Sequence, residues 1–237
     1  MNYFTIISRF SESLSLRAMQ RLSGLSRNTI QNRIDRASRY CIAKTVEILR
    51  KLKVKEDLVA DGFESFAKSQ YFPHNIHILV GSRSQFLYFF NHVALKRKGR
   101  MTEAQKKRKQ TLYKTCHFPK HSIKNAFMEV ADHIKQMFFY QGISPLHLYT
   151  DKKKEYKQAI EEIQAEYGGK KDIIQIMISS KKKRNKNNRL FAVNYMDREF
   201  RKDQAAFRRE SPCFARNTNN AVSYTHLRAH ETSLHLV

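Results

Sequence analysis

The sequence is poor in residues that cross-link, break or anchor a chain. Its 237 residues include three cysteines, four prolines, seven glycines and no tryptophan. Cys41, Cys116 and Cys213 lie far apart and form no Cys-x-x-Cys pair, which argues against a zinc ribbon and a disulfide framework. No apolar run approaches the roughly 20 residues of a membrane-spanning helix, and the first residues do not resemble a secretory signal. We therefore expect no membrane segment and a reducing, cytoplasmic location.

Acidic residues are scarce as well. The chain has 21 Asp and Glu against 45 Lys and Arg, which gives a formal net charge of +24. Hydrophobic residues make up 41% and aromatic residues 11%, so the chain can form a core and is not a disordered basic tail. Because charge repulsion on this scale opposes folding, a polyanionic partner is expected, and nucleic acid is the leading candidate. The alternative is a basic protein that only coats RNA or a membrane surface.

The N-terminal region has the pattern of two helices joined by a short turn. Residues 14–23 fit a short amphipathic helix, and Gly24 is suited to the left-handed conformation that ends one. Ser26 stands at the N-cap position of a second helical pattern, which continues as one or two helices to about residue 53. This is the helix-turn-helix layout, in which the second helix enters the major groove of DNA. The alternative is an ordinary helical hairpin with a polar outer face.

The start of the second helix carries the side chains that would contact DNA. Asn and Gln can pair with adenine and Arg with guanine, whereas other polar groups contact phosphates. The predicted DNA-binding residues here are Arg27, Asn28, Thr29, Gln31, Asn32 and Arg33.

The remainder of the chain reads as strands followed by alternating helices and strands. Strands are expected at residues 58–66, 76–80, 85–90, 146–151 and 173–178, with Pro73 in a loop. Helices are expected at residues 122–140, with Ser122 as the cap, and at residues 156–167. This order predicts an α/β fold with a mixed sheet and packed helices. His77, a single polar residue in an apolar strand, is interpreted as a core histidine rather than a ligand.

Two stretches are dense in lysine and arginine. Residues 96–114 form either a solvated surface or an arm that grips phosphates, and the sequence does not decide between them. Residues 179–189 form a loop predicted to grip the DNA backbone through Lys181, Lys182, Lys183 and Arg184. Cys116, His117 and His121 lie close together in the sequence, but they lack a fourth ligand for a structural zinc ion.

Two aspartates carry the chemical prediction. Asp61 lies inside the first strand and Asp151 ends the fourth. Two strand-borne carboxylates in a strongly basic chain indicate a metal-dependent site that acts on phosphodiesters. Two divalent ions about 4 Å apart can bind the attacking and leaving oxygens of an in-line phosphoryl displacement. Mg²⁺ prefers oxygen ligands and keeps several waters, so a few acids are enough.

The order of strands and helices is also that of the ribonuclease-H-like fold. Residues 188–199 and 208–217 resemble the C-terminal block of bacterial insertion-sequence transposases of the DDE type, and residues 58–66 and 147–151 resemble the other two blocks. The resemblance covers roughly residues 15–220. It implies a ribonuclease-H-like α/β catalytic domain, preceded by a small all-α helix-turn-helix unit.

The resemblance also implies a catalytic triad and its partners. Asp61, Asp151 and Glu210 would hold Mg²⁺ or Mn²⁺. Independently of the resemblance, the charge of Arg209 and its proximity in sequence predict a further DNA contact. Other acids after the fifth strand are Asp197, Glu199 and Asp203. One departure from a helical third block is Pro212, whose ring cannot continue an α-helix from the preceding turn. The implied partners are double-stranded DNA, as element ends and target, and further copies of the chain on that DNA in the nucleoid.

The predicted organisation has three parts. Residues 1–54 form the helix-turn-helix region with its linker helix, residues 55–221 the catalytic domain, and residues 222–237 a non-native tail. Residues 223–232 resemble a translated sequencing-adapter tail. With the native C-terminal helix cut short, it stays open whether the fragment keeps the activity of its family. The start at Met1 can also be internal, so it stays open whether a zinc-binding segment preceded it. Two other classes stay open: a DNA-binding regulator, and a ribonuclease-H-like nuclease that joins no strands.

Overall fold

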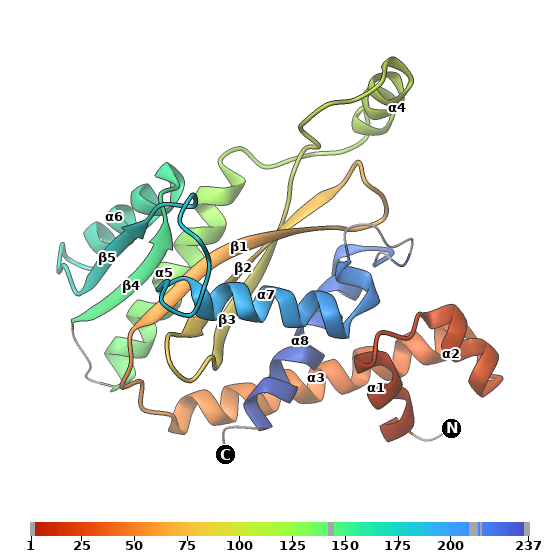
Figure 1. Cartoon of the computed structure of the whole chain (residues 1–237), viewed down its shortest axis with the longest axis horizontal. Helices are drawn as coiled ribbons and strands as arrows, with labels where there is room; N and C mark the ends of the chain where they lie inside the picture. Colours follow the sequence, from red (N-terminus) through yellow and green to blue (C-terminus); the bar gives the residue numbers. More distant parts are fainter. Residues whose placement is uncertain (1–2, 142–144, 209–212, 214, 235–237) are drawn as a thin grey trace.

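The centre of the molecule is a five-stranded mixed sheet with helices on both faces (Figure 1). The computed structural model describes residues 3–141, 145–208, 213 and 215–234. The strands are β1 (Leu58–Phe66), β2 (Pro73–Gly81), β3 (Leu87–Ala94), β4 (Leu146–Asp151) and β5 (Ile173–Ile178). Their order across the sheet is β3-β2-β1-β4-β5, with β1 to β3 antiparallel and β1, β4 and β5 parallel. This confirms the predicted α/β class with a mixed sheet, and the strand order is compatible with a ribonuclease-H-like fold.

Eight α-helices and one short 3-10 helix surround the sheet within the described residues. They are α1 (Tyr3–Ser11), α2 (Leu16–Ser23), α3 (Arg27–Lys51), α4 (Glu103–Tyr113), α5 (Ser122–Gln141), α6 (Lys154–Glu166), α7 (Phe191–Asp203), the 3-10 turn (Ala205–Phe207) and α8 (Thr218–Leu234). Helix α7 crosses one face of the sheet, and α5 and α6 lie on the other (Figure 1). None of the helices in the described ranges has both the length and the apolarity needed to cross a membrane.

Alternation along β1 divides the core between the two faces. Leu58 and Ala60 point to the side of α5 and α6, whereas Val59 and Phe63 point to the side of α7. Successive side chains of a strand face opposite sides, so one strand supplies both clusters. By the same alternation Asp61 lies on the α7 side of the sheet.

The N-terminal helices share a core with the α7 side of the sheet. Ile6 of α1, Met19 of α2 and Ile34 of α3 are fully buried in the same hydrophobic cluster as Val59 and Phe200. Helices α1, α2 and α3 are therefore packed against the sheet region through one continuous apolar cluster.

The local geometry between α2 and α3 follows the sequence pattern. Gly24 adopts φ 69°, and its N–H donates to the carbonyl oxygen of Gln20, which closes α2. The Ser26 hydroxyl accepts from the Thr29 N–H at 3.1 Å, which caps α3. Helix α3 is one uninterrupted helix to Lys51. The two helices and their turn are present; that they read DNA stays a prediction.

Some expectations about individual elements are wrong. Pro73 begins β2, paired with Phe66, instead of lying in a loop, because the first residue of a strand tolerates the missing N–H. Helix α1 was not expected. Helix α4 lies within the basic stretch 96–114 and has no buried residue, so it projects from the body (Figure 1).

The segment predicted to be a non-native tail is helical where it is described. Tyr224, Thr225 and Leu227 of α8 are buried, and α8 packs along α3. The Tyr224 hydroxyl donates to Gln31 Oε1 at 2.7 Å. The non-native origin of residues 222–237 stays a prediction. In this structure the described part of the segment completes the hydrophobic cluster around α3.

Candidate functional site

Asp61 and Asp151 lie next to each other on adjacent parallel strands. The β1–β4 register pairs Val59 with Tyr149 and Ala60 with Thr150, and the two aspartates are the next residues on each strand. Neighbouring strands are about 4.8 Å apart, so the two carboxylates meet at the C-terminal edge of β4. Their side chains are 16% and 11% exposed, respectively. The fold thus brings together the two acids that the sequence singled out.

A lysine and an arginine neutralise this pair. Lys153 Nζ lies 3.5 Å from Asp61 Oδ1 and 3.4 Å from Asp151 Oδ2. Arg184 Nη2 lies 3.5 Å from Asp61 Oδ2. Backbone N–H groups add to the anchoring, since Gly62 donates to Asp61 at 2.8 Å and Lys153 donates to Asp151 at 3.1 Å. The acids are held by two cations and two amides.

The electrostatics of the pair favour added positive charge. Burial raises the pKa of the Asp151 carboxyl above its ordinary value, the Asp61 carboxylate raises it further, and the Lys153 ammonium opposes both. Burial alone would lower the pKa of Lys153, but Tyr156 and the two carboxylates outweigh it and hold that pKa above its usual range. Lys153 therefore stays charged. Lys153 was not among the residues predicted from the sequence, although its position two residues after Asp151 is a usable signal.

The predicted third acid, Glu210, lies outside the described residues, and so does Arg209. Of the other candidates on α7, Asp197 lines a cavity of about 20 Å³ together with Asp61 and Asn194. Its carboxylate also accepts from Arg201 Nε at 2.8 Å. The cavity has room for about one water molecule.

Glu199 and Asp203, the remaining acids of α7, pair with α8 and not with the acidic site. Arg228 of α8 lies 2.8 Å from Asp203 and 3.6 Å from Glu199. Both acids are thereby used in ion pairs between α7 and α8. Asp197 is thus the α7 acid that shares a cavity with Asp61.

The two carboxylates fit a divalent cation in their chemistry. They are oxygen donors side by side, and oxygen atoms are the preferred ligands of Mg²⁺ and Mn²⁺. The contacts of Lys153 and Arg184 with Asp61 indicate that the two carboxylates stabilise positive charge at this position. No group of three His, Cys, Asp or Glu side chains able to hold a metal ion occurs within the described ranges. This holds also for Cys116, His117 and His121. The described donor set is therefore a pair.

His77 is a core residue, as expected. It is fully buried on β2, with Nδ1 3.1 Å from Asn91 Oδ1 and its ring against Phe127 and Tyr156. Burial lowers the pKa of His77 to about 4. The ring is thus neutral over the physiological range.

The residues of α3 that are predicted to contact DNA differ in their exposure to solvent. Asn28 and Asn32 are exposed, whereas Arg27, Thr29 and Arg33 are half-buried. Both ends of the Gln31 amide are used within the protein: Nε2 donates to Asp35 at 2.8 Å and Oε1 accepts from Tyr224. Reaching a base would require Gln31 to break these bonds.

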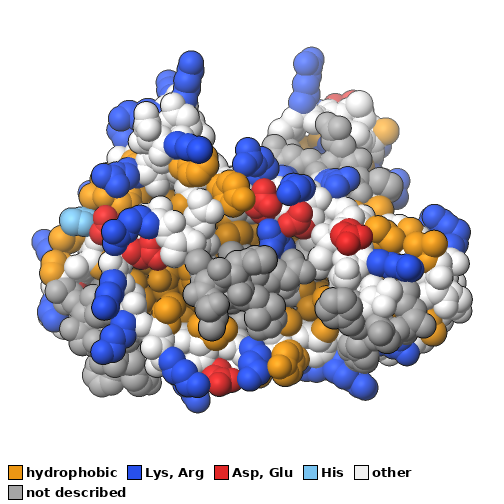
Figure 2. All heavy atoms as spheres, turned by 60° about the horizontal axis from the view of Figure 1, so that its bottom comes forward, with side chains coloured by type: hydrophobic (Ala, Val, Ile, Leu, Met, Phe, Trp, Pro, Cys, Tyr) orange, Lys and Arg blue, Asp and Glu red, His pale blue; other side chains and the backbone are white. Residues whose placement is uncertain are grey.

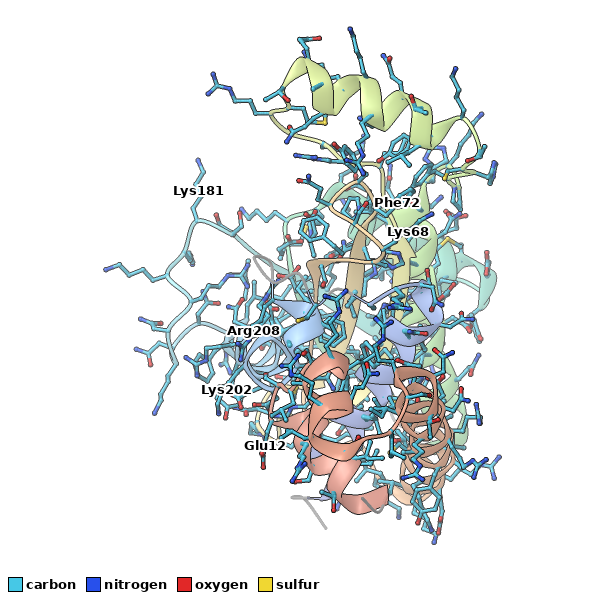
Figure 3. All side chains as sticks on the ribbon, turned by 90° about the vertical axis from the view of Figure 1, so that its right-hand side faces the viewer. Glu12, Lys68, Phe72, Lys181, Lys202 and Arg208 are labelled. Atoms are coloured by element: carbon cyan, nitrogen blue, oxygen red, sulfur yellow. The ribbon has the colours of Figure 1, made fainter. Side chains whose placement is uncertain are left out.

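The predicted DNA-gripping loop splits into two parts. Lys181, Lys182 and Lys183 are exposed, and Lys181 extends away from the body in Figure 3. Arg184 instead turns inward to Asp61 and Asn194, so it belongs to the acidic site. Figure 2 shows Lys and Arg side chains at the tips of two projections, with a notch between them. The exposed Lys181, Lys182 and Lys183 directly precede Arg184 of the acidic site in the chain, so this loop adds positive charge beside that site.

Comparison with known proteins returns no relative: neither a family model nor a curated protein matches the chain.

Proposed function

We propose that the chain is a metal-dependent enzyme of DNA phosphodiester chemistry, the transposase of an insertion sequence. The observation that carries the proposal is the juxtaposition of Asp61 and Asp151 on β1 and β4, in a chain of net charge +24. Paired, partly buried carboxylates with a perturbed pKa are typical of functional sites. The resemblance of residues 188–217 to a transposase block gives the proposal its family.

Each residue has a distinct part in the proposed site. Asp61 and Asp151 would hold a divalent metal ion, with Glu210 as the proposed third ligand. A bound metal would supply Lewis-acid charge at the reacting phosphate. Lys153 compensates the charge of the two carboxylates. Lys181, with the lysines beside it, holds the backbone of DNA by charge.

The helix pair α2–α3 is proposed to recognise DNA. Asn28 and Asn32 are the exposed side chains near the start of α3 that suit base edges. A regulator that uses only this helix pair is the second candidate, supported by the capped turn at Gly24 and Ser26. A nuclease with the same acidic site but no strand joining is the third.

A strand-transfer assay separates the three. The substrate is DNA that carries the repeats flanking the gene, with a supercoiled plasmid as target and Mg²⁺ present. The transposase proposal predicts joined products that disappear in Asp61→Asn. Cleaved but unjoined DNA identifies a nuclease. Salt-sensitive binding without cleavage, unchanged by Asp61→Asn, identifies a regulator and contradicts the proposal.

A further inference from the structure

A second basic site lies at the root of α4. It is a cavity of about 560 Å³, within the usual range for ligand sites. Five cationic side chains line it, against the acids Glu64 and Glu155. The cationic residues are Lys96, Arg97, Lys98, Lys120 and Lys124. The excess of positive charge fits an anion.

The walls of this cavity are held in place by specific contacts. The Tyr113 hydroxyl donates to the carbonyl oxygen of Tyr71 at 2.6 Å and accepts from the Arg97 N–H at 2.7 Å. Lys96 Nζ lies 5.6 Å from the centre of the Phe118 ring. These contacts position Lys96 and Arg97 before any ligand binds, which lowers the entropic cost of binding.

Arg97 also has unused capacity for a ligand. Its guanidinium lies 5.1 Å from the Tyr71 ring, and its buried Nη1 has no hydrogen-bond partner among the described residues. A buried cationic donor without a partner costs free energy that an anionic ligand would recover. In contrast, Lys124 is already paired with Glu162.

The cavity lies on the face of the sheet that α5 and α6 cover. Lys124 of α5 and Glu155 of α6 line it, and Glu64 of β1 projects to this face by the same alternation that places Asp61 on the α7 face. The cavity is therefore a binding site separate from the acidic pair.

We propose that this cavity binds the sugar-phosphate backbone of a DNA strand. This binding does not depend on the proposed function of the acidic pair. Helix α4 continues the same basic surface outward, and Figure 3 shows it above Lys68 and Phe72, on the outer side of the molecule. The charge of the cavity, its preorganised donors and the adjoining basic helix fit a nucleic-acid strand.

Binding of a short DNA duplex in EDTA tests the cavity without any catalysis. The variant is Lys96→Ala/Lys120→Ala, and the matched control is Lys170→Ala/Lys171→Ala, two exposed lysines before β5 at the opposite edge of the sheet. Each lost phosphate contact flattens the plot of log K against log salt by about 0.9, so the cavity variant is expected to flatten it by about 1.8 and to bind at least about tenfold more weakly. The control retains the wild-type slope. Equal slopes for both variants, or tighter binding of a free deoxynucleotide than of DNA, would overturn the proposal.

A cleavage assay separates this site from the proposed function. DNA binding that weakens in Lys96→Ala/Lys120→Ala, without Mg²⁺-dependent cleavage by the wild-type chain, would refute the proposed function and leave the binding site standing.

Discussion

Protonation of His77 should destabilise the fold in mild acid. Asn91 Nδ2 donates to the carbonyl oxygen of Ala126 at 2.6 Å, which leaves Asn91 Oδ1 as the acceptor for a proton on His77 Nδ1. The unprotonated Nε2 is buried and has no hydrogen-bond partner among the described residues. A second proton there would place a charge against the rings of Phe127 and Tyr156, with no hydrogen-bond acceptor for it among the described residues.

The size of the effect follows from the two pKa values. The pKa of His77 is lowered by burial from 6.5 to about 4. The unfolded chain therefore takes up a proton below pH 6.5, while the folded chain does so only near pH 4. Stability is fully present above pH 6.5 and falls as pH decreases, by about 1.4 kcal/mol per pH unit and about 3 kcal/mol in all.

Urea unfolding at several pH values between 7.5 and 4 measures this slope. In His77→Leu, the decrease in unfolding free energy with falling pH should be about 3 kcal/mol smaller than in the wild-type chain. His117→Leu, which removes an exposed histidine, should leave the slope as it is. The other buried histidines are retained in all three proteins, and His77→Leu also removes the charge repulsion by which His77 lowers the pKa of His92. A His77→Leu slope equal to that of the wild-type chain would refute the reasoning.

Three further predictions concern the buried ion pair, the shared core and the metal site. Lys135→Met leaves the buried Asp172 without its cation and should lower the unfolding free energy by about 3–5 kcal/mol in urea titration, whereas Lys135→Met/Asp172→Leu should recover most of the loss. Ile34→Ala should cost about 2–5 kcal/mol and shift helix and tertiary signals together, because α3 shares its core with the sheet; separate transitions would contradict this. Mg²⁺ affinity, measured by calorimetry, should rise with pH through the raised pKa of Asp151, since only the carboxylate binds metal; a flat profile in that range would count against the site.

The sequence predicted the elements whose pattern is local. The bounds of β1 and β5 are those expected, because each is an apolar run enclosed by polar or turn residues. Helix α3 was expected because its cap, Ser26, and its apolar spacing are readable without tertiary context. Helix α4 was concealed by its charge, although Thr102 and Gln105 form a capping box that marks its start.

The site was predictable in part for the same reason. Asp61 and Asp151 stand on recognisable strands, and the strand order brings them together. The inward turn of Arg184 and the bridging position of Lys153 depend on how the loop and α6 pack, which no local pattern encodes. The engagement of Gln31 by Tyr224 likewise joins residues from opposite ends of the chain.

The central claim is that Asp61 and Asp151 form a metal site for DNA cleavage, and cleavage itself tests it most directly. Mg²⁺-dependent cleavage of DNA carrying the flanking repeats is measured for the wild-type chain, Asp151→Asn and Glu161→Gln, an exposed acid of α6. We predict cleavage that requires Mg²⁺, is lost by about a hundredfold or more in Asp151→Asn, and is unchanged in Glu161→Gln. Cleavage by Asp151→Asn at the wild-type rate would contradict the account.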